Sequence, residues 1–443
     1  MSRTSVFLVS STLLAGSALG GENWPQWRGP NLDGTSDSTG LPTSWSDTGN
    51  VKWKAALPSW SGSSPIVFGD RVFVMSPSSA RDGQVAPTRS SLGVKLAKEG
   101  KDLLLICLAR KDGARLWEHR VSDDNAHEAK HNMSSPSPVA DGRHVWVMTG
   151  TGKVKCLDVE GRPVWDRDIQ KDYGQFGQLW GHGSSPVLVD GLLIIEVLHG
   201  KKTQAPSYLL GLDAATGKTV YRVERPTDAP EESQDAYTTP TLLKYRDHAE
   251  LIVSGGAYIT GHDPKTGKEI WRCGGLNPRR ETVWRAVGSP VAVDGVAYAV
   301  IRNGPMVACR GGGTGDVTGT HTLWTSELAA DVPSPVTDGK YLYILHDSGV
   351  LSCLDAKTGK PYYTRQRVAR GTFSASPLLA DGRIYATGED GKTTMVSAGP
   401  EFKILGSHQL PGGYTLSSIA VGGKDLFIRT ATTLYCIGKT DDK

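Results

Sequence analysis

The sequence has no excess of charge of one sign and no run of like charges. Its 443 residues hold 49 Lys and Arg against 46 Asp and Glu, for a formal net charge of +3. Basic residues alternate with acidic ones along the chain, and no stretch of five or six like charges occurs. Because nucleic acids and anionic membranes are bound through basic patches, neither is expected as a partner.

Long apolar runs are also missing beyond the first twenty residues. A membrane span needs about 20 apolar residues, so no transmembrane segment is expected in the mature chain. Residues 1–20 combine Arg3, a short apolar stretch from Val6 to Ala15, and small residues at Ala18 and Gly20, which is the pattern of a signal peptide. We therefore expect a periplasmic or secreted protein. Ser17 stands where a bacterial lipoprotein carries its lipidated cysteine, so no lipid anchor is predicted.

What the sequence does contain is a repeated phrase. It runs from Ser/Thr-Pro through two apolar residues, a turn and an alternating apolar run to Leu-Asp, Thr-Gly-Lys and an aromatic residue. Copies begin at Ser64-Pro65, Ser137-Pro138, Ser185-Pro186, Thr239-Pro240, Ser289-Pro290, Ser334-Pro335 and Ser376-Pro377, with a degenerate eighth at Ser417-Ser418. The later copies follow one another at about 41 to 54 residues, the period of a four-stranded propeller blade. The sequence thus predicts an all-β, eight-bladed β-propeller, expected to be a monomer.

The sixth copy shows the four strands, which we call A to D. Strand A covers 334–337, strand B 341–346, strand C 350–355 and strand D 361–363. Asp-Gly pairs join strands A and B here and in four other copies, because Asp-Gly accepts the positive φ of a type I′ turn. The strand D aromatics are predicted to pack between neighbouring blades; they are Trp117, Trp165, Tyr221, Trp271, Trp324 and Tyr363.

The eighth copy lacks a strand D, and the N-terminal segment supplies a candidate. Residues 51–54 read as an orphan strand D with Trp53 as its aromatic, so we expect this strand to close the ring. The propeller then spans 51–438, preceded by an irregular extension over 21–50 that packs on the propeller surface and followed by a polar tail over 439–443. Residues 77–101 are expected to form a long exposed loop, and the glycine-rich stretch 311–320 a flexible connection with no phosphate site.

Six cysteines in an exported protein invite a disulfide framework, but their spacing argues against one. Five of them fall at one place in strand C of different blades, with Gly211, Gly261 and Ser397 as counterparts; they are Cys107, Cys156, Cys309, Cys353 and Cys436. Equivalent positions in neighbouring blades should lie beyond the roughly 7 Å Cα limit for a disulfide. We read this position as a slot for a small side chain. Cys273 is expected to have no partner.

The candidate site lies in the loops that join strand D of one blade to strand A of the next. These D–A loops open with the B–C loops on one face, around the central channel. The predicted ligand-binding residues are Trp60, His131, Asn132, Trp180, His182, Asp235, Tyr237, Trp284, Arg285 and Arg370. Aromatic faces and a few oriented polar groups are typical of a ligand pocket, but the same side chains can instead plug the channel and satisfy loop backbones. Both interpretations remain open.

Two local motifs resemble hydrolase sites without their context. His127 to His131 match the H-E-x-x-H zinc pattern, which requires both histidines on one face of a long helix and a further ligand. The match falls in a loop between blades, so no metal site is predicted. Ser184 lies in Gly-His-Gly-Ser-Ser, which lacks the form of a nucleophile elbow, and no catalytic residue is assigned.

The phrases at 212–218, 262–271 and 354–360 resemble the pyrroloquinoline-quinone repeat superfamily over about residues 50–438. The resemblance implies the fold but leaves function open. Its alcohol dehydrogenase branch implies a quinone stacked on adjacent cysteines beside calcium and a catalytic carboxylate, and no such cysteine pair occurs here. Its non-enzymatic branch includes an outer-membrane assembly scaffold. We expect a binding or scaffold protein without a cofactor, presenting its loop face to a protein, peptide or carbohydrate; the alternatives are a quinone-dependent oxidoreductase of sugars or alcohols and, less favoured, a metal-dependent hydrolase.

Overall fold

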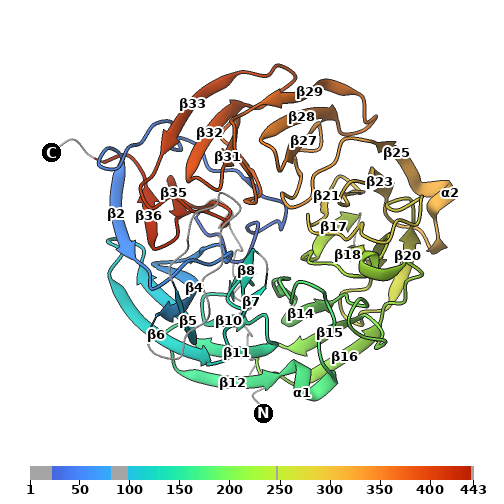
Figure 1. Cartoon of the computed structure of the whole chain (residues 1–443), viewed down its shortest axis with the longest axis horizontal. Coiled ribbons are helices and arrows are strands. Elements are labelled where there is room, and N and C mark those ends of the chain that lie inside the picture. Colours follow the sequence, from blue (N-terminus) through green and yellow to red (C-terminus); the bar gives the residue numbers. More distant parts are fainter. Residues whose placement is uncertain (1–21, 81–97, 129, 246–247, 441–443) are drawn as a thin grey trace, which may run out of the picture.

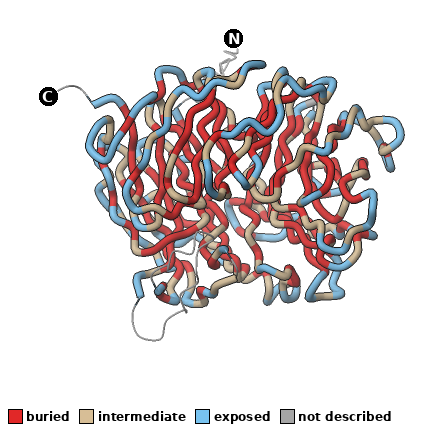
Figure 2. The backbone as a smooth tube through the Cα atoms, turned by 45° about the horizontal axis from the view of Figure 1, so that its top comes forward, coloured by how far each residue is buried: buried red, intermediate tan, exposed pale blue. Residues whose placement is uncertain are grey.

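Eight sheets of four or five strands are arranged around a central channel, and each is one blade of a β-propeller (Figure 1). The computed structural model describes residues 22–80, 98–128, 130–245 and 248–440. The predicted signal peptide, most of the blade 1 insertion and the last residues of the tail lie outside the described residues. Along the described chain the buried stretches follow the strands, and the exposed stretches lie mainly at the two ends of the propeller (Figure 2).

The first four blades follow one another in sequence. Blade 1 consists of β3 (Ile66–Phe68), β4 (Arg71–Ser79), β5 (Glu99–Ala109) and β6 (Arg115–Ser122). Blade 2 consists of β9 (Val139–Ala140), β10 (His144–Met148), β11 (Lys153–Asp158) and β12 (Pro163–Asp168). Blade 3 consists of β13 (Val187–Val189), β14 (Leu192–Val197), β15 (Tyr208–Asp213) and β16 (Thr219–Glu224). Blade 4 consists of β17 (Thr241–Tyr245), β18 (His248–Gly255), β19 (Tyr258–His262) and β20 (Glu269–Cys273), with β24 (Gly315–Asp316) added at its outer edge.

The remaining blades complete the circle. Blade 5 consists of β21 (Val291–Val293), β22 (Val296–Ala299), β23 (Met306–Arg310) and β25 (Thr322–Ser326). Blade 6 consists of β26 (Val336–Thr337), β27 (Tyr341–His346), β28 (Val350–Asp355) and β29 (Pro361–Arg367). Blade 7 consists of β30 (Leu378–Ala380), β31 (Arg383–Thr387), β32 (Lys392–Ser397) and β33 (Ile404–Gln409), with β1 (Thr35–Ser36) at its inner edge. Blade 8 consists of β34 (Ala420–Gly422), β35 (Asp425–Arg429), β36 (Thr433–Ile437) and the N-terminal β2 (Val51–Ala56).

Short elements occupy the connections between these strands. A hairpin of β7 (His127–Glu128) and β8 (His131–Asn132) lies between blades 1 and 2. The helices are α1 (Ile169–Tyr173), a 3₁₀ turn over Glu231–Gln234 and α2 (Thr318–His321). No helix in the described part of the chain is long and apolar enough to cross a membrane.

The predicted latch is confirmed. β2 pairs antiparallel with β36, and Trp53 stands opposite Cys436. Strand β2 lies beside β36 at the rim, so the beginning and the end of the propeller share one sheet (Figure 1). Closure in this way leaves no open sheet edge between the first and last blades.

Most strand D aromatics dock on the next blade, as predicted. Trp53 donates its indole N–H to the Arg110 carbonyl of blade 1 at 2.8 Å, and Trp117 donates to Val159 of blade 2 at 2.9 Å. Trp165, Tyr221 and Trp324 make the same kind of bond to the following blade. In these five cases the ring lies against a glycine of the next blade's C–D turn, where a Cβ atom would stand 2.4 to 2.7 Å from the ring. Only glycine allows so close an approach.

Trp271 departs from this rule. Its indole N–H donates to Glu250 Oε2 of its own blade at 2.8 Å, and its ring covers Gly261. The reason is that blade 5 has the glycine-rich insertion in place of a short C–D turn. This insertion was expected to be a flexible connection, but it forms β24, which pairs with β20, and then α2.

The prediction that strand C has a position for a small side chain is correct in outline, but it names the wrong residue in two blades. The residue opposite the aromatic is Cys107, Cys156, Gly211, Gly261, Cys353 or Cys436 in six blades. In blade 5 it is Ala308, so Cys309 lies one position further along. In blade 7 it is Met395 and not Ser397, and it faces Gly406. The sequence alone did not reveal these registers, because Ala308 and Cys309 are both small and because strand D of blade 7 has Gly406 in place of an aromatic residue.

The Asp-Gly turns are of two kinds, which the sequence did not distinguish. At Asp190, Asp294 and Asp381 both the aspartate and the following glycine have positive φ, as a type I′ turn requires. At Asp141 and Asp338 only the glycine does. There the aspartate carboxylate accepts two backbone N–H groups further along the turn, at 2.7 to 2.9 Å, so a side chain stabilises a wider loop.

The first part of the N-terminal extension, up to β1, was expected to pack on the propeller surface, but it is largely buried and bonds to the inner strands of blades around the channel. Residues 37–50 pack on blade 7 and are mostly exposed, as expected. Trp24 exchanges two backbone hydrogen bonds with Val67 of blade 1. Ala140 of blade 2 and Leu379 of blade 7 donate to carbonyls of the extension at 2.8 and 3.0 Å. The inner edges of these strands would otherwise carry unpaired N–H groups, so the extension completes the core of the ring.

A closed belt of hydroxyl hydrogen bonds joins all eight blades. The Ser or Thr two residues before each strand A donates its backbone N–H to the side-chain oxygen of its counterpart in the next blade, at 2.8 to 3.0 Å. The members are Ser64, Ser137, Ser185, Thr239, Ser289, Ser334, Ser376 and Ser418, and the last donates back to the first. The repeated Ser/Thr of the sequence therefore has a structural role in joining blade to blade.

Replacing Ser289 with alanine tests this belt. The change leaves the buried N–H of Thr239 without its acceptor at 2.8 Å. We expect the free energy of unfolding to fall by about 1–3 kcal/mol, measured by urea denaturation. Ser289→Thr is the matched control, because Thr239 fills the same place in blade 4, and it should stay close to the wild type. An alanine variant as stable as the wild type would show that the belt contributes nothing.

Candidate functional site

A cavity of about 590 Å³ opens at the end of the channel where the D–A and B–C loops meet. Seven of the eight belt hydroxyls line it, all except Ser289. Trp27 of the N-terminal extension also lines it, so that the extension closes the cavity toward the channel. Each belt oxygen already accepts a backbone N–H, which leaves its own O–H hydrogen to point elsewhere. The wall therefore offers a ring of hydroxyl donors.

One side of the cavity is aromatic. Trp180, Tyr237 and His131 come from three successive D–A loops. The Tyr237 hydroxyl accepts the backbone N–H of Trp180 at 3.1 Å, and His131 Nε2 hydrogen-bonds to the Trp180 carbonyl. Burial lowers the pKa of His131, which favours the neutral ring. Trp180 is 37 % exposed, so a large apolar surface faces solvent here.

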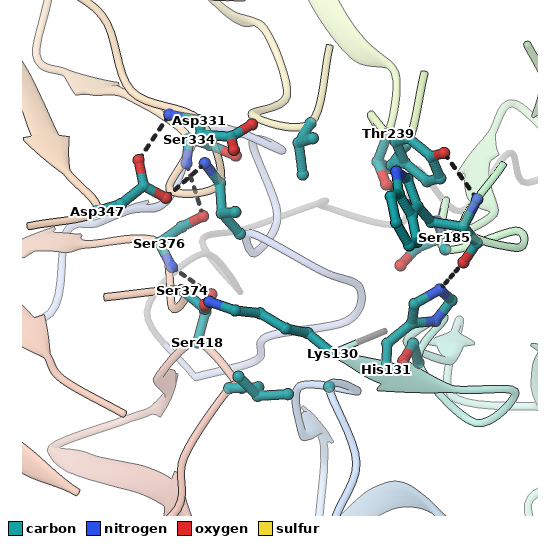
Figure 3. Close-up of a pocket in the computed structure, with 18 of the residues that line it drawn as sticks. Lys130, His131, Ser185, Thr239, Asp331, Ser334, Asp347, Ser374, Ser376 and Ser418 are labelled. Carbon is teal, nitrogen blue, oxygen red and sulfur yellow. Dashed lines mark hydrogen bonds between the residues drawn. The ribbon is translucent and has the colours of Figure 1, made fainter. Parts of the chain in front are cut away.

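The charged side begins beside Trp180, whose indole N–H donates to Glu232 Oε1 at 2.9 Å. Arg285 Nη1 lies 3.0 Å from the same oxygen, and its Nη2 lies 3.7 Å from Asp331 Oδ2. Arg302 also approaches Asp331, at 3.5 Å. Asp347 accepts the backbone N–H of Asp331 at 2.7 Å and so fixes this loop (Figure 3). Burial raises the pKa of Asp331, although both arginines act in the other direction. Asp331 Oδ1 has no hydrogen-bond partner among the described residues.

Lys130 links the two sides. It directly precedes β8 in the turn of the β7–β8 hairpin, and its ammonium lies 3.0 Å from Glu389 Oε1 in the B–C loop of blade 7. In the close-up Lys130 extends across the cavity toward Ser374 and Ser418 (Figure 3). Ser374 donates to the same carboxylate oxygen at 2.5 Å. Glu389 is fully buried, so Lys130 supplies the charge that this carboxylate needs.

Four of the ten predicted ligand-binding residues line the cavity, namely His131, Trp180, Tyr237 and Arg285. The other six do not. Trp284 is partly buried against the core of blades 3 to 5, and Arg370 is exposed away from the cavity. Whether any of the ten binds a ligand stays a prediction.

The remaining four anchor the loops. Trp60 is buried against His127 and Tyr414, with ring centroids 5.0 and 5.7 Å away. Asn132 donates to the Trp60 carbonyl at 3.1 Å, and His182 contacts Gln178 at 3.2 Å. Asp235 accepts the N–H groups of Leu179 and Lys201. Each interpretation of the D–A loops therefore holds for some residues. Some side chains face the cavity, and others form hydrogen bonds with backbone groups of the loops.

Several residues that line the cavity were not predicted from the sequence. Arg302, Asn303 and Asp347 belong to B–C loops, and His346 is the last residue of strand B in blade 6. The signal was present, because B–C loops open on the same face as D–A loops, and in the sixth copy Asp347 directly follows strand B. Lys130 was overlooked beside the histidines of the H-E-x-x-H match.

That match does not build a zinc site. His127 and His131 lie on the two strands of a hairpin and not on a helix. His127 Nε2 lies 3.3 Å from Glu99 Oε1, whereas His131 turns to Trp180. No group of three His, Cys, Asp or Glu side chains within the described ranges is placed to hold a metal ion.

Comparison with known proteins identifies the family. The family described as outer membrane protein assembly factor BamB matches residues 35–175, 101–317 and 313–399. BamB of Yersinia pestis is 21% identical over 338 residues, which are 73% of this chain and 77% of the relative.

Solved structures share the fold. BamB from Moraxella catarrhalis superimposes with a TM-score of 0.56 at 15% identity, covering 82% of this chain and 100% of the other. A europium-containing methanol dehydrogenase reaches 0.68 at 11% identity over 93% and 90%. The quinohemoprotein alcohol dehydrogenase of Comamonas testosteroni reaches 0.64 at 12% over 95% and 81%. Structural likeness at such low sequence identity shows the fold alone. The family match, by contrast, spans most of the sequence. This chain therefore belongs to the BamB family of propellers with pyrroloquinoline-quinone-type repeats.

Proposed function

We propose that the protein is an exported, non-enzymatic scaffold that binds a segment of a protein partner at its loop face. The observation that carries the proposal is the wall of the cavity. Its exposed Trp180 provides apolar contact area, while Arg285 and Lys130 already pair with Glu232 and Glu389 of the same chain. Such a mixed, internally neutralised surface suits a peptide or loop with both apolar and polar groups. The relatives are described as assembly factors for outer membrane proteins, which supports a protein partner in the cell envelope.

The quinone alternative finds little support in the residues present. A quinone cofactor with calcium needs free carboxylates for the metal and, in the alcohol branch, adjacent cysteines. The sequence has no adjacent cysteines. Of the carboxylates that line the cavity, Asp331 faces two arginines and Asp347 accepts the backbone N–H groups of Asp331 and Val332. Glu389, next to the cavity, is bound to Lys130 and Ser374. These residues do not fit the cofactor.

In-cell photo-crosslinking tests the proposal. Trp180 is replaced with a photoreactive phenylalanine derivative, and Tyr362 is replaced in a parallel variant. Tyr362 is a matched control, because it is also an exposed aromatic (43 %) but lies on the outer strand of blade 6. We expect a discrete protein adduct from position 180 and none from position 362. Adducts from both positions, or from neither, would contradict binding at the loop face.

A further inference from the structure

Two cysteine thiols meet at the boundary between blades 4 and 5. Cys273 is the last residue of β20, the strand D of blade 4, and Cys309 lies in β23, the strand C of blade 5. Thr322 connects the two side chains: Cys273 Sγ lies 3.3 Å from Thr322 Oγ1, and Thr322 is the direct cross-strand partner of Cys309. The structure records both cysteines as free thiols, so whether Cys273 has a disulfide partner stays open at this point.

Their environment is apolar and closed. Both cysteines have no exposed surface, and both belong to the same hydrophobic core as Val317 and Leu276. The other four cysteines occupy the strand C slot of separate blades, opposite the strand D aromatics. The one-residue register shift of Cys309 is what brings its thiol to Cys273 instead of placing it under an aromatic ring.

We propose that Cys273 and Cys309 form a disulfide in the mature protein, a covalent link between blades 4 and 5. The link would stand where the usual indole hydrogen bond to the next blade is missing, since Trp271 donates to Glu250 of its own blade, and it would add to the pairing of β20 with β24. The inference rests on the proposed export, because disulfides persist in oxidising compartments outside the cytoplasm.

The chemistry is a thiol–disulfide exchange. The two thiols lose two protons and two electrons as the Sγ–Sγ bond forms, and a disulfide oxidant of the thiol-exchange class is reduced to two thiols. Because both sulfurs are buried in the folded protein, the exchange takes place during folding or through local opening of the glycine-rich segment. Once formed, the bond is shielded from reductants, as expected of a structural disulfide.

The test uses the full mature chain isolated from its own cells with thiols blocked at lysis by N-ethylmaleimide. We expect a non-reducing digest to contain one linked peptide pair, joining Cys273 to Cys309, and alkylation after unfolding to label four of the six cysteines. Reduction should lower Tm by several degrees. The variant C273S should abolish the linked pair and this dependence on reductant, whereas C353S, a buried cysteine in the strand C slot, should change neither.

A second experiment tests whether the two cysteines can pair, independently of the compartment in which the protein resides. Reduced, purified protein is refolded in a glutathione redox buffer. If no Cys273–Cys309 peptide forms there, or if other cysteines pair instead, the inference is overturned while the proposed scaffold function stands. If the bond forms in the buffer but both thiols are free in protein from cells, the inference fails for the native protein, and the proposed export fails with it.

Discussion

Replacing Trp53 with alanine is expected to lower the free energy of unfolding by about 3–5 kcal/mol, the usual loss for a large buried aromatic side chain. Trp53 is 7 % exposed, packs at 5.9 Å from the Phe427 ring and donates its indole N–H to Arg110 of blade 1. It also fills the space over Gly113. The change therefore weakens blade 8 internally and removes its contact with blade 1, at the place where the chain closes its ring.

Urea denaturation monitored by circular dichroism measures this effect. Trp53→Phe should lose less than Trp53→Ala, because it keeps one aromatic ring, although it gives up the second ring of the indole and the N–H bond to Arg110, the bond being worth about 1 kcal/mol. Tyr362→Ala on an exposed strand D face should change little. A Trp53→Ala variant within experimental error of the wild type would mean that β2 is not a stabilising latch.

Glu196→Gln is expected to stabilise the protein above pH 8 and to leave it nearly unchanged at pH 5. Glu196 lies in β14 and is almost wholly buried, with Thr238 donating to its Oε1 at 2.8 Å. Burial raises the pKa of Glu196 to about 8 from its ordinary value of 4.5. Its Oε2 has no hydrogen-bond partner among the described residues.

The sign follows from proton linkage. Between pH 4.5 and 8 the folded protein holds a proton on Glu196 that the unfolded chain has lost, so stability falls as the pH rises through this window. Glutamine mimics the protonated form and removes the dependence. We expect the variant to exceed the wild type by a few kcal/mol at pH 8.5, because each tenfold difference in proton affinity between the folded and unfolded chain corresponds to about 1.4 kcal/mol.

Buried histidines do not disturb this comparison. Burial lowers the pKa of His182 and of His262 to about 3, so their contribution to stability is lost as the pH falls from 6.5 toward 3, in both proteins alike. Urea midpoints at pH 5, 6.5 and 8.5 provide the measurement. Glu401→Gln, at an exposed position, is the control. A Glu196→Gln variant that is less stable than the wild type at pH 8.5 would contradict the raised pKa.

The repeat phrase was enough to predict the blades and the latch, because each strand carries its own periodicity and turn chemistry. In the sixth copy the predicted strands B and C coincide with β27 and β28. Contacts between blades were harder to predict. The Ser/Thr before each strand A was visible as a repeat, but its role as an acceptor for the preceding blade depends on the geometry of the closed ring.

The site was predicted only in part for a related reason. A loop position does not reveal which way its side chain points, so Trp180 and Trp60 looked alike although one faces the cavity and the other is buried under it. The prediction was built on the residues of the D–A loops and left out the B–C loops, where Arg302 and Asp347 complete the charged side. The N-terminal extension has no periodicity, and the place of its first part around the channel follows only from the unpaired inner strands that it satisfies.

The central claim is that the loop-face cavity receives a protein partner and not a redox cofactor. The measurement that tests this most directly is a thermal titration of the purified mature protein with pyrroloquinoline quinone and Ca²⁺. The account predicts an unchanged Tm at every concentration of the pair. A saturable rise would contradict it, since a ligand at a hundred times its Kd adds about 2.7 kcal/mol to the folded state, and the cavity would then be a quinone pocket.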